Sequence, residues 1–99
     1  MAPRLPSKLI VSALVRRVEQ AGGFAAVLAR GEEWGGVILV QTSENGRFTG
    51  LFERMFDLDG VPRMTPCGPP PGSEADALAS YLDRRRAADT DLWIVELDI

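Results

Sequence analysis

The stretch VILVQTSENGRFTGLFERMF, residues 37–56, decides the fold class because it holds two β-rich runs joined by an asparagine–glycine pair. Residues 37–41 are mostly apolar and do not alternate with polar residues, which is typical of a strand covered on both faces. Asn45-Gly46 favours a type I′ turn, since both central residues of that turn need a positive φ. Residues 47–56 are then the return strand, and we predict an antiparallel hairpin in the middle of the chain.

A helix is predicted on either side of this hairpin in the sequence. Residues 8–21 carry apolar side chains at the 3.6-residue spacing of a helix, with Ser7 as a candidate N-cap and Gly22-Gly23 as the stop. Residues 74–88 show a similar spacing, and Ser73 begins a variant of the capping box. Both segments are therefore predicted to be amphipathic helices.

Three shorter segments are predicted to be further strands. Residues 24–30 are bounded by glycines at strand length, and residues 61–65 follow a turn at 57–60 and favour a short edge strand. Residues 92–98 alternate cleanly, which is typical of a half-buried strand. We expect the side of this strand that carries Trp93 to face the second helix.

The order of these elements predicts an α+β fold, α-β-β-β-(β)-α-β along the chain. We expect both helices to pack on one face of a mainly antiparallel sheet of four or five strands. The last strand follows a helical crossover, which leaves a parallel pairing open for it. Residues 1–99 are predicted to form a single domain, with an extended arm at 1–6 and a proline-rich loop at 66–72.

Composition describes an ordinary small domain with an acidic balance. The chain has 99 residues, of which 45% are hydrophobic and 25% charged, so we expect one core. We expect no membrane segment and no signal peptide. The net charge of −3 argues against non-specific binding to nucleic acid. Residues 1–30 are nevertheless locally basic, with five basic side chains and one acidic side chain.

The residue types give little support to catalysis. The chain contains no histidine and a single cysteine, Cys67, which removes most catalytic triads, most zinc sites and any internal disulfide. We therefore expect a non-enzymatic protein with no metal and no cofactor. One unpaired thiol fits the reducing cytoplasm.

The end of the second predicted helix gives the strongest binding signal. Residues 84–86 are three arginines, and two aspartates and a tryptophan follow them at the junction with the last strand. Such a cluster could recognise an acidic peptide or a phosphate, or it could be a charged helix end bound to local aspartates. We expect Arg85 to point inward and bond Asp91 or Glu96, with Arg84 and Arg86 more exposed. The candidate binding residues are Arg16, Arg84, Arg85, Arg86, Asp89, Asp91, Trp93 and Glu96.

Several segments resemble the domain of unknown function 1491 family. The ending DLWIVELD, residues 91–98, is the most specific of them. The other similar stretches are residues 3–6, 11–18, 22–25, 27–31, 84–86 and 89–90. The resemblance implies a short bacterial cytoplasmic protein and supplies no catalytic residues. It adds Gly23 to the candidate residues.

Two function hypotheses follow from these observations. The first is a protein–protein interaction module with an unidentified protein partner, and a homodimer stays open. The second is a regulator that binds a small ligand or a nucleotide through the arginine-rich patch. Nucleic-acid binding is the least favoured, because the chain is acidic overall.

Overall fold

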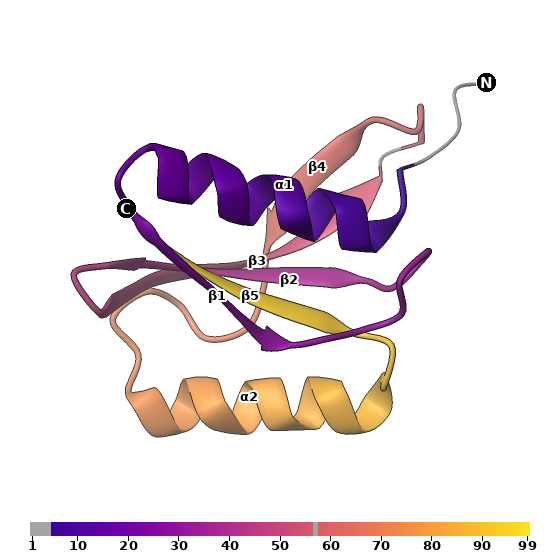
Figure 1. Cartoon of the computed structure of the whole chain (residues 1–99). Coiled ribbons are helices and arrows are strands. Elements are labelled where there is room, and N and C mark those ends of the chain that lie inside the picture. Colours follow the sequence, from indigo (N-terminus) through magenta and orange to yellow (C-terminus); the bar gives the residue numbers. More distant parts are fainter. Residues whose placement is uncertain (1–4, 57) are drawn as a thin grey trace.

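The computed structural model describes residues 5–56 and 58–99 and shows two helices and one five-stranded sheet (Figure 1). The elements are α1 (Ser7–Gln20), β1 (Phe24–Ala29), β2 (Ile38–Glu44), β3 (Arg47–Phe56), β4 (Pro62–Pro66), α2 (Ala75–Ala88) and β5 (Trp93–Asp98). The predicted α+β class and the predicted element order are confirmed. Residues 1–4 of the predicted arm and Asp57 of the predicted turn lie outside the described residues.

The last strand of the chain sits inside the sheet. The strand order is β1-β5-β2-β3-β4, so β5 inserts between β1 and β2. Three of the four pairings are antiparallel, and β2 and β5 run parallel. The prediction of a mainly antiparallel sheet is confirmed. Because β5 takes one side of β1, the other side of β1 forms an edge of the sheet.

The predicted hairpin turn is present between β2 and β3. Asn45 has a φ of 54° and Gly46 a φ of 81°, as a type I′ turn requires. The two oxygens of the Asp98 carboxylate accept hydrogen bonds from the Asn45 and Gly46 amides, at 2.9 and 2.8 Å. The end of β5 therefore holds the tip of the hairpin.

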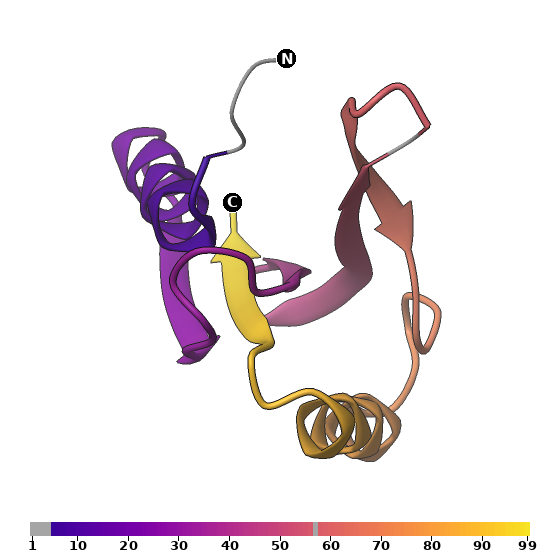
Figure 2. The ribbon, with the colours of Figure 1, turned by 90° about the vertical axis from the view of Figure 1, so that its right-hand side faces the viewer.

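The two helices cover opposite faces of the sheet, so the prediction that they share one face is wrong (Figures 1 and 2). One buried cluster lies on the side of α2 and comprises Ala29, Leu39, Leu51, Leu78, Leu92 and Ile94. The other lies on the side of α1 and comprises Val11, Ile38, Val40, Trp93 and Val95. Trp93 therefore faces α1, where α2 had been expected. The physical reason is that β2 and β5 are apolar on both faces, and each face needs a cover.

Both predicted helix caps are also wrong. Ser7 is the first residue of α1, and its hydroxyl donates to the Gly36 carbonyl at 2.6 Å. Carbonyls of the loop before β2 satisfy the first helical amides, since Lys8 N–H donates to the Glu33 oxygen at 2.9 Å. Ser73 donates to the Pro70 carbonyl at 2.7 Å and does not cap α2. In place of the two predicted caps, Ser7 makes a long-range hydrogen bond to the loop before β2, and Ser73 makes a hydrogen bond within a local turn.

The loop from 30 to 37 lies tightly against the start of β5. The Trp93 indole N–H donates to the Glu32 carbonyl at 2.7 Å, and Glu32 N–H donates to the Asp91 carbonyl at 3.0 Å. A Cβ added at Gly31 or Gly36 would clash with the Asp91 carbonyl oxygen. Glycine is therefore required at both positions by close approach of two backbones.

Substitution of these glycines should test that packing. We expect Gly31→Ala and Gly36→Ala each to lower the free energy of unfolding by about 1–3 kcal/mol, because the backbones must move apart. Gly35→Ala is the matched control, since the nearest atom to its Cβ is the end of the Glu32 side chain at 3.9 Å. Urea denaturation measures all three, and an unchanged Gly31→Ala variant would contradict the close approach.

Trp93 should be the more important of the two tryptophans for stability. Its side chain is 2% exposed, whereas that of Trp34 is 72% exposed. We expect Trp93→Ala to cost about 3–5 kcal/mol of unfolding free energy and Trp34→Ala to cost less than about 1 kcal/mol. Equal losses in urea denaturation would show that the assigned burial is wrong.

Candidate functional site

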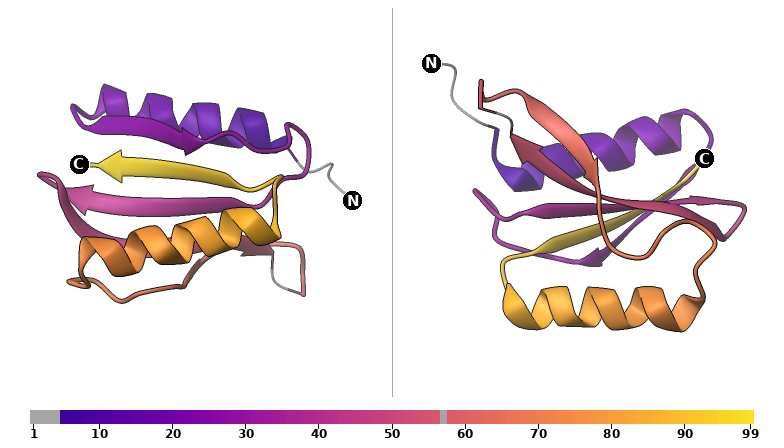
Figure 3. Two further views of the ribbon diagram at one scale, coloured as in Figure 1. Left: turned by 90° about the horizontal axis from the view of Figure 1, so that it is seen from below. Right: turned by 180° about the vertical axis from the view of Figure 1, so that it is seen from behind.

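Arg85 is the inward-facing arginine of α2, as predicted, but its partner differs from the prediction. Its Nη2 donates to Glu53 Oε1 at 2.6 Å and its Nη1 to the Tyr81 hydroxyl oxygen at 2.8 Å. The expected bond to Asp91 or Glu96 is absent from the described contacts, because α2 lies across β2 and β3 (Figure 3). Burial lowers the pKa of Arg85, but the hydrogen bonds to Glu53 and Tyr81 outweigh it, so its pKa is raised. The guanidinium is therefore a permanently charged tie between α2 and β3.

Cys67 lies beside this tie and is not arranged as a nucleophile. Burial raises the pKa of Cys67 above its ordinary value, more than Tyr81 and Arg85 lower it. The thiol therefore stays protonated at neutral pH, and the thiolate is the reactive form.

The other predicted site residues of this region do not form one site. Arg84 and Arg86 are exposed, as predicted. Asp89 Oδ1 accepts from the Asp91 amide at 3.0 Å, which is a local turn interaction. Glu96 Oε2 accepts from Ser43 Oγ at 3.1 Å and from Gln41 Nε2 at 3.3 Å, so it joins β5 to β2.

The arginine, aspartate and tryptophan cluster is thus divided between the two faces of the sheet. Trp93 lies on the α1 side, whereas the residues of α2 lie on the other side. Arg86 and Asp89 do line a common hollow, together with Arg30 and Asp83. Two cations and two carboxylates give that hollow no charge preference.

Within residues 5–56 and 58–99, no group of three or more cysteine or acidic side chains is placed to hold a metal ion. Neither helix in this part of the chain is long and apolar enough to cross a membrane.

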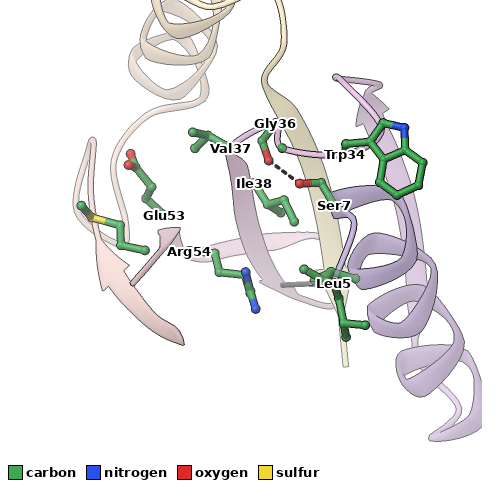
Figure 4. A pocket seen from close by; sticks show the side chains of 11 residues that line it. Leu5, Ser7, Trp34, Gly36, Val37, Ile38, Glu53 and Arg54 are labelled. Atoms are coloured by element: carbon green, nitrogen blue, oxygen red, sulfur yellow. Dashed lines mark hydrogen bonds between the residues drawn. The ribbon is translucent and has the colours of Figure 1, made fainter. Parts of the chain in front are cut away.

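A pocket of about 290 Å³ opens between the start of α1, the loop before β2 and the far end of β3 (Figure 4). Leu5, Trp34 and Val37 supply apolar walls. Two of its polar side chains are already bound, because Ser7 donates to Gly36 and Glu53 accepts from Arg85. Arg54 also lines the pocket and has a partner of its own, so apolar walls combine there with polar side chains that are already engaged within the protein (Figure 4).

A second hollow, the α1–β1 groove, has a different character. It measures about 320 Å³ and is lined by Lys8, Val11, Ser12, Val15, Arg16, Glu19, Val27, Arg30 and Trp93. Its floor is apolar, and its charged side chains are three cations and one carboxylate. The Arg30 guanidinium lies 5.7 Å from the centre of the Trp93 ring, which favours a cation–π contact.

The arginines of the α1–β1 groove are available to a ligand. Lys8 Nζ lies 3.6 Å from Glu33 Oε1, and both of these side chains are at least half exposed. Among the described residues, no carboxylate forms a salt bridge with Arg16 or Arg30. Two of the predicted site residues, Arg16 and Trp93, therefore line the α1–β1 groove.

The groove opens at the free edge of β1, a feature that the sequence analysis missed. Phe24, Val27 and Leu28 are 60%, 39% and 47% exposed, and β1 carries no charge and no proline. The opposite edge strand, β4, contains Pro62 and Pro66, which block pairing with another strand. The locally basic composition of residues 1–30 was the one sequence signal that pointed to this region.

Comparison with known proteins agrees with the predicted family. The sequence profile of the family described as "Protein of unknown function (DUF1491)" matches residues 5–99. The chain belongs to the DUF1491 family. A solution structure of a protein from A. tumefaciens is 36% identical, with a TM-score of 0.79 over 98% of this chain and 87% of that chain. A crystal structure of a DUF1491 family protein from Caulobacter crescentus CB15 is 29% identical, with a TM-score of 0.85 over 97% of this chain and 89% of that chain. A search of the curated proteins gives no match.

The segment that most resembles the DUF1491 family has a structural part in this chain. Asp91 and Trp93 hold the loop before β2, Glu96 joins β2, and Asp98 holds the hairpin. A Cβ at Gly23 would lie 2.5 Å from the Asp98 carbonyl oxygen, so Gly23 also serves the packing of β5. These residues therefore hold the fold of this chain together around β5.

The three arginines of α2 should differ in their effect on stability. We expect Arg85→Ala to lower the free energy of unfolding by about 1–3 kcal/mol, because it leaves Glu53 and Tyr81 without their partner. Arg84→Ala and Arg86→Ala are matched controls on the exposed face and should change it by less than about 0.5 kcal/mol. Thermal melts at neutral pH measure the difference. Equal effects of the three substitutions would mean that the Arg85 tie contributes nothing.

Proposed function

We propose that this chain is a non-enzymatic protein–protein interaction module that binds an extended segment of a partner protein at the free edge of β1. The observation that carries the proposal is an edge strand that has no charged residue and no proline, has exposed apolar side chains, and pairs in regular register over residues 24–27 before an irregularity between Val27 and Ala29. An edge strand offers unpaired backbone N–H and C=O groups, and an extended peptide satisfies them by adding a strand.

The position of α1 favours this binding mode over a flat sheet edge. α1 packs on β1 and β5 (Figures 2 and 3). The α1–β1 groove is lined by residues of both α1 and β1. A peptide that lies between an edge strand and a helix gains backbone hydrogen bonds from the strand and side-chain contacts from the helix, as in PDZ domains. α1 and β1 therefore provide the two walls that such recognition uses.

The alternative, a ligand-binding regulator that uses the arginine-rich patch, has less support. It needs Arg84, Arg85 and Arg86 to act together, whereas Arg85 is bound to Glu53 and Tyr81. We keep the cytoplasm as the proposed location, because a lone unpaired thiol fits a reducing compartment.

Selection of displayed random dodecapeptides on the purified protein should test the proposal. We expect enriched peptides to bind the wild type and to lose at least about tenfold in affinity for Phe24→Asp, because a buried charge would face the added strand. Met64→Asp on β4 is the matched control, since Met64 is similarly exposed on the opposite edge. Fluorescence anisotropy of labelled peptides measures both.

Two results would contradict this function. One is the enrichment of peptides that bind the wild type and both variants equally, which would place binding away from β1. The other is the absence of any enriched peptide from libraries that yield binders to a PDZ domain in parallel.

A further inference from the structure

We propose that the segment bound at β1 alternates in character, with acidic side chains toward α1 and apolar side chains toward the other face. This inference names the partner chemistry of the site and rests on the proposed function. It combines the direction of the β1 side chains with the charge of the α1–β1 groove.

The register of β1 against β5 fixes which side chains lie on which face. Val27 pairs with Val95, which belongs to the cluster on the α1 side. Phe24 pairs with Asp98 and Ala26 with Glu96, whose side chains alternate with those of that cluster and lie on the other face. The register shifts between Val27 and Ala29, so the regular alternation covers residues 24–27. A strand added beside these residues repeats the alternation, so every second side chain meets the groove under α1.

The α1 side of the added strand meets a basic surface. α1 and β1 run in opposite directions, so Arg30, which follows β1, lies toward the Lys8 end of α1 (Figure 1). Arg16 lines the same groove two turns further along α1, against the single carboxylate of Glu19. Guanidinium groups bind carboxylates in pairs of parallel hydrogen bonds, so acidic side chains suit this wall.

The opposite side of the added strand meets an apolar surface. Phe24 is exposed there, and α2 is displaced toward β2 and β3, so it does not cover this part of β1 (Figure 3). Apolar side chains of the segment therefore bury against Phe24. The predicted pattern is acidic and apolar residues in alternation beside residues 24–27 of β1.

A second copy of this chain fits the site less well. If β1 of one copy paired antiparallel with β1 of another, the two sheets would join into one continuous sheet about a two-fold axis perpendicular to it. Both α1 helices would then lie on the same face of the joined sheet. The two basic grooves would then face each other, and like charges there would oppose the pairing. The charge of the groove favours an acidic segment over self-association.

Short peptides of defined pattern test this inference. The probe is a labelled seven-residue peptide that alternates glutamate and valine. We expect it to bind at least about tenfold more tightly than the same peptide with lysine in place of glutamate. A third peptide, with the same composition but with the glutamates and valines in separate blocks, should also bind at least about tenfold more weakly, because it cannot present two faces.

Two variants of equal charge change identify the arginine involved. We expect Arg16→Gln to weaken binding of the alternating peptide about fivefold, as for a partly exposed ion pair. Arg17→Gln removes the same charge from an exposed position outside the groove and should leave the affinity within about twofold. Both substitutions lie on the helix surface, and equal melting temperatures confirm that folding is unaffected.

The outcomes separate this inference from the proposed function. Equal binding of the glutamate and lysine peptides, or equal effects of Arg16→Gln and Arg17→Gln, overturns the acidic pattern. If the display selection still yields peptides that depend on Phe24, the interaction module stands with another sequence preference. A concentration-dependent dimer that Phe24→Asp abolishes and the glutamate peptide does not dissociate would assign the edge to self-association.

Discussion

The insertion of β5 between β1 and β2 is the constraint on which the rest of the structure depends. Leu92, Trp93, Ile94 and Val95 are each at most 2% exposed, so this short segment is buried on both faces and on both sides. Two covered faces require two helices, one above and one below. The same insertion requires glycine where the loop before β2 crosses the Asp91 carbonyl. The strand that comes last in the chain therefore determines where the earlier elements lie.

The sequence was sufficient to predict the elements but not which face each helix covers. Local signals fixed the helices and the turn, because Asn45-Gly46 and the helical spacing of apolar residues act within a few residues. Residues 37–41 correctly indicated a strand covered on both faces, and that signal argued for a helix on each side. The alternation of residues 92–98 predicts a half-buried strand, with one covered face, whereas β5 is covered on both. Leu92 and Ile94 alternate with Trp93 and Val95, so apolar side chains lie on both faces of the strand. This alternation does not indicate which helix covers which pair.

The candidate site was also predicted only in part, because its contacts depend on the tertiary fold and not on local sequence. Arg85 was correctly expected to point inward, but its partner Glu53 lies 32 residues away on β3, and only the tertiary fold brings the two together. Arg16 was among the predicted residues, whereas the free edge of β1 was not. An edge is a property of strand order, and strand order depends on where β5 inserts. Residues 91–98 thus build the centre of the sheet, and the proposed binding surface lies on the strand at its margin.

Amide hydrogen exchange with and without the alternating glutamate–valine peptide tests the central claim most directly. Strand addition must protect amides of β1 that point out of the sheet, because the peptide carbonyls accept hydrogen bonds from them. The account predicts slower exchange at alternate positions within residues 24–27 of β1 and unchanged exchange in β4. Protection confined to β4 or to α2, with β1 exchanging as it does in the free protein, would contradict it.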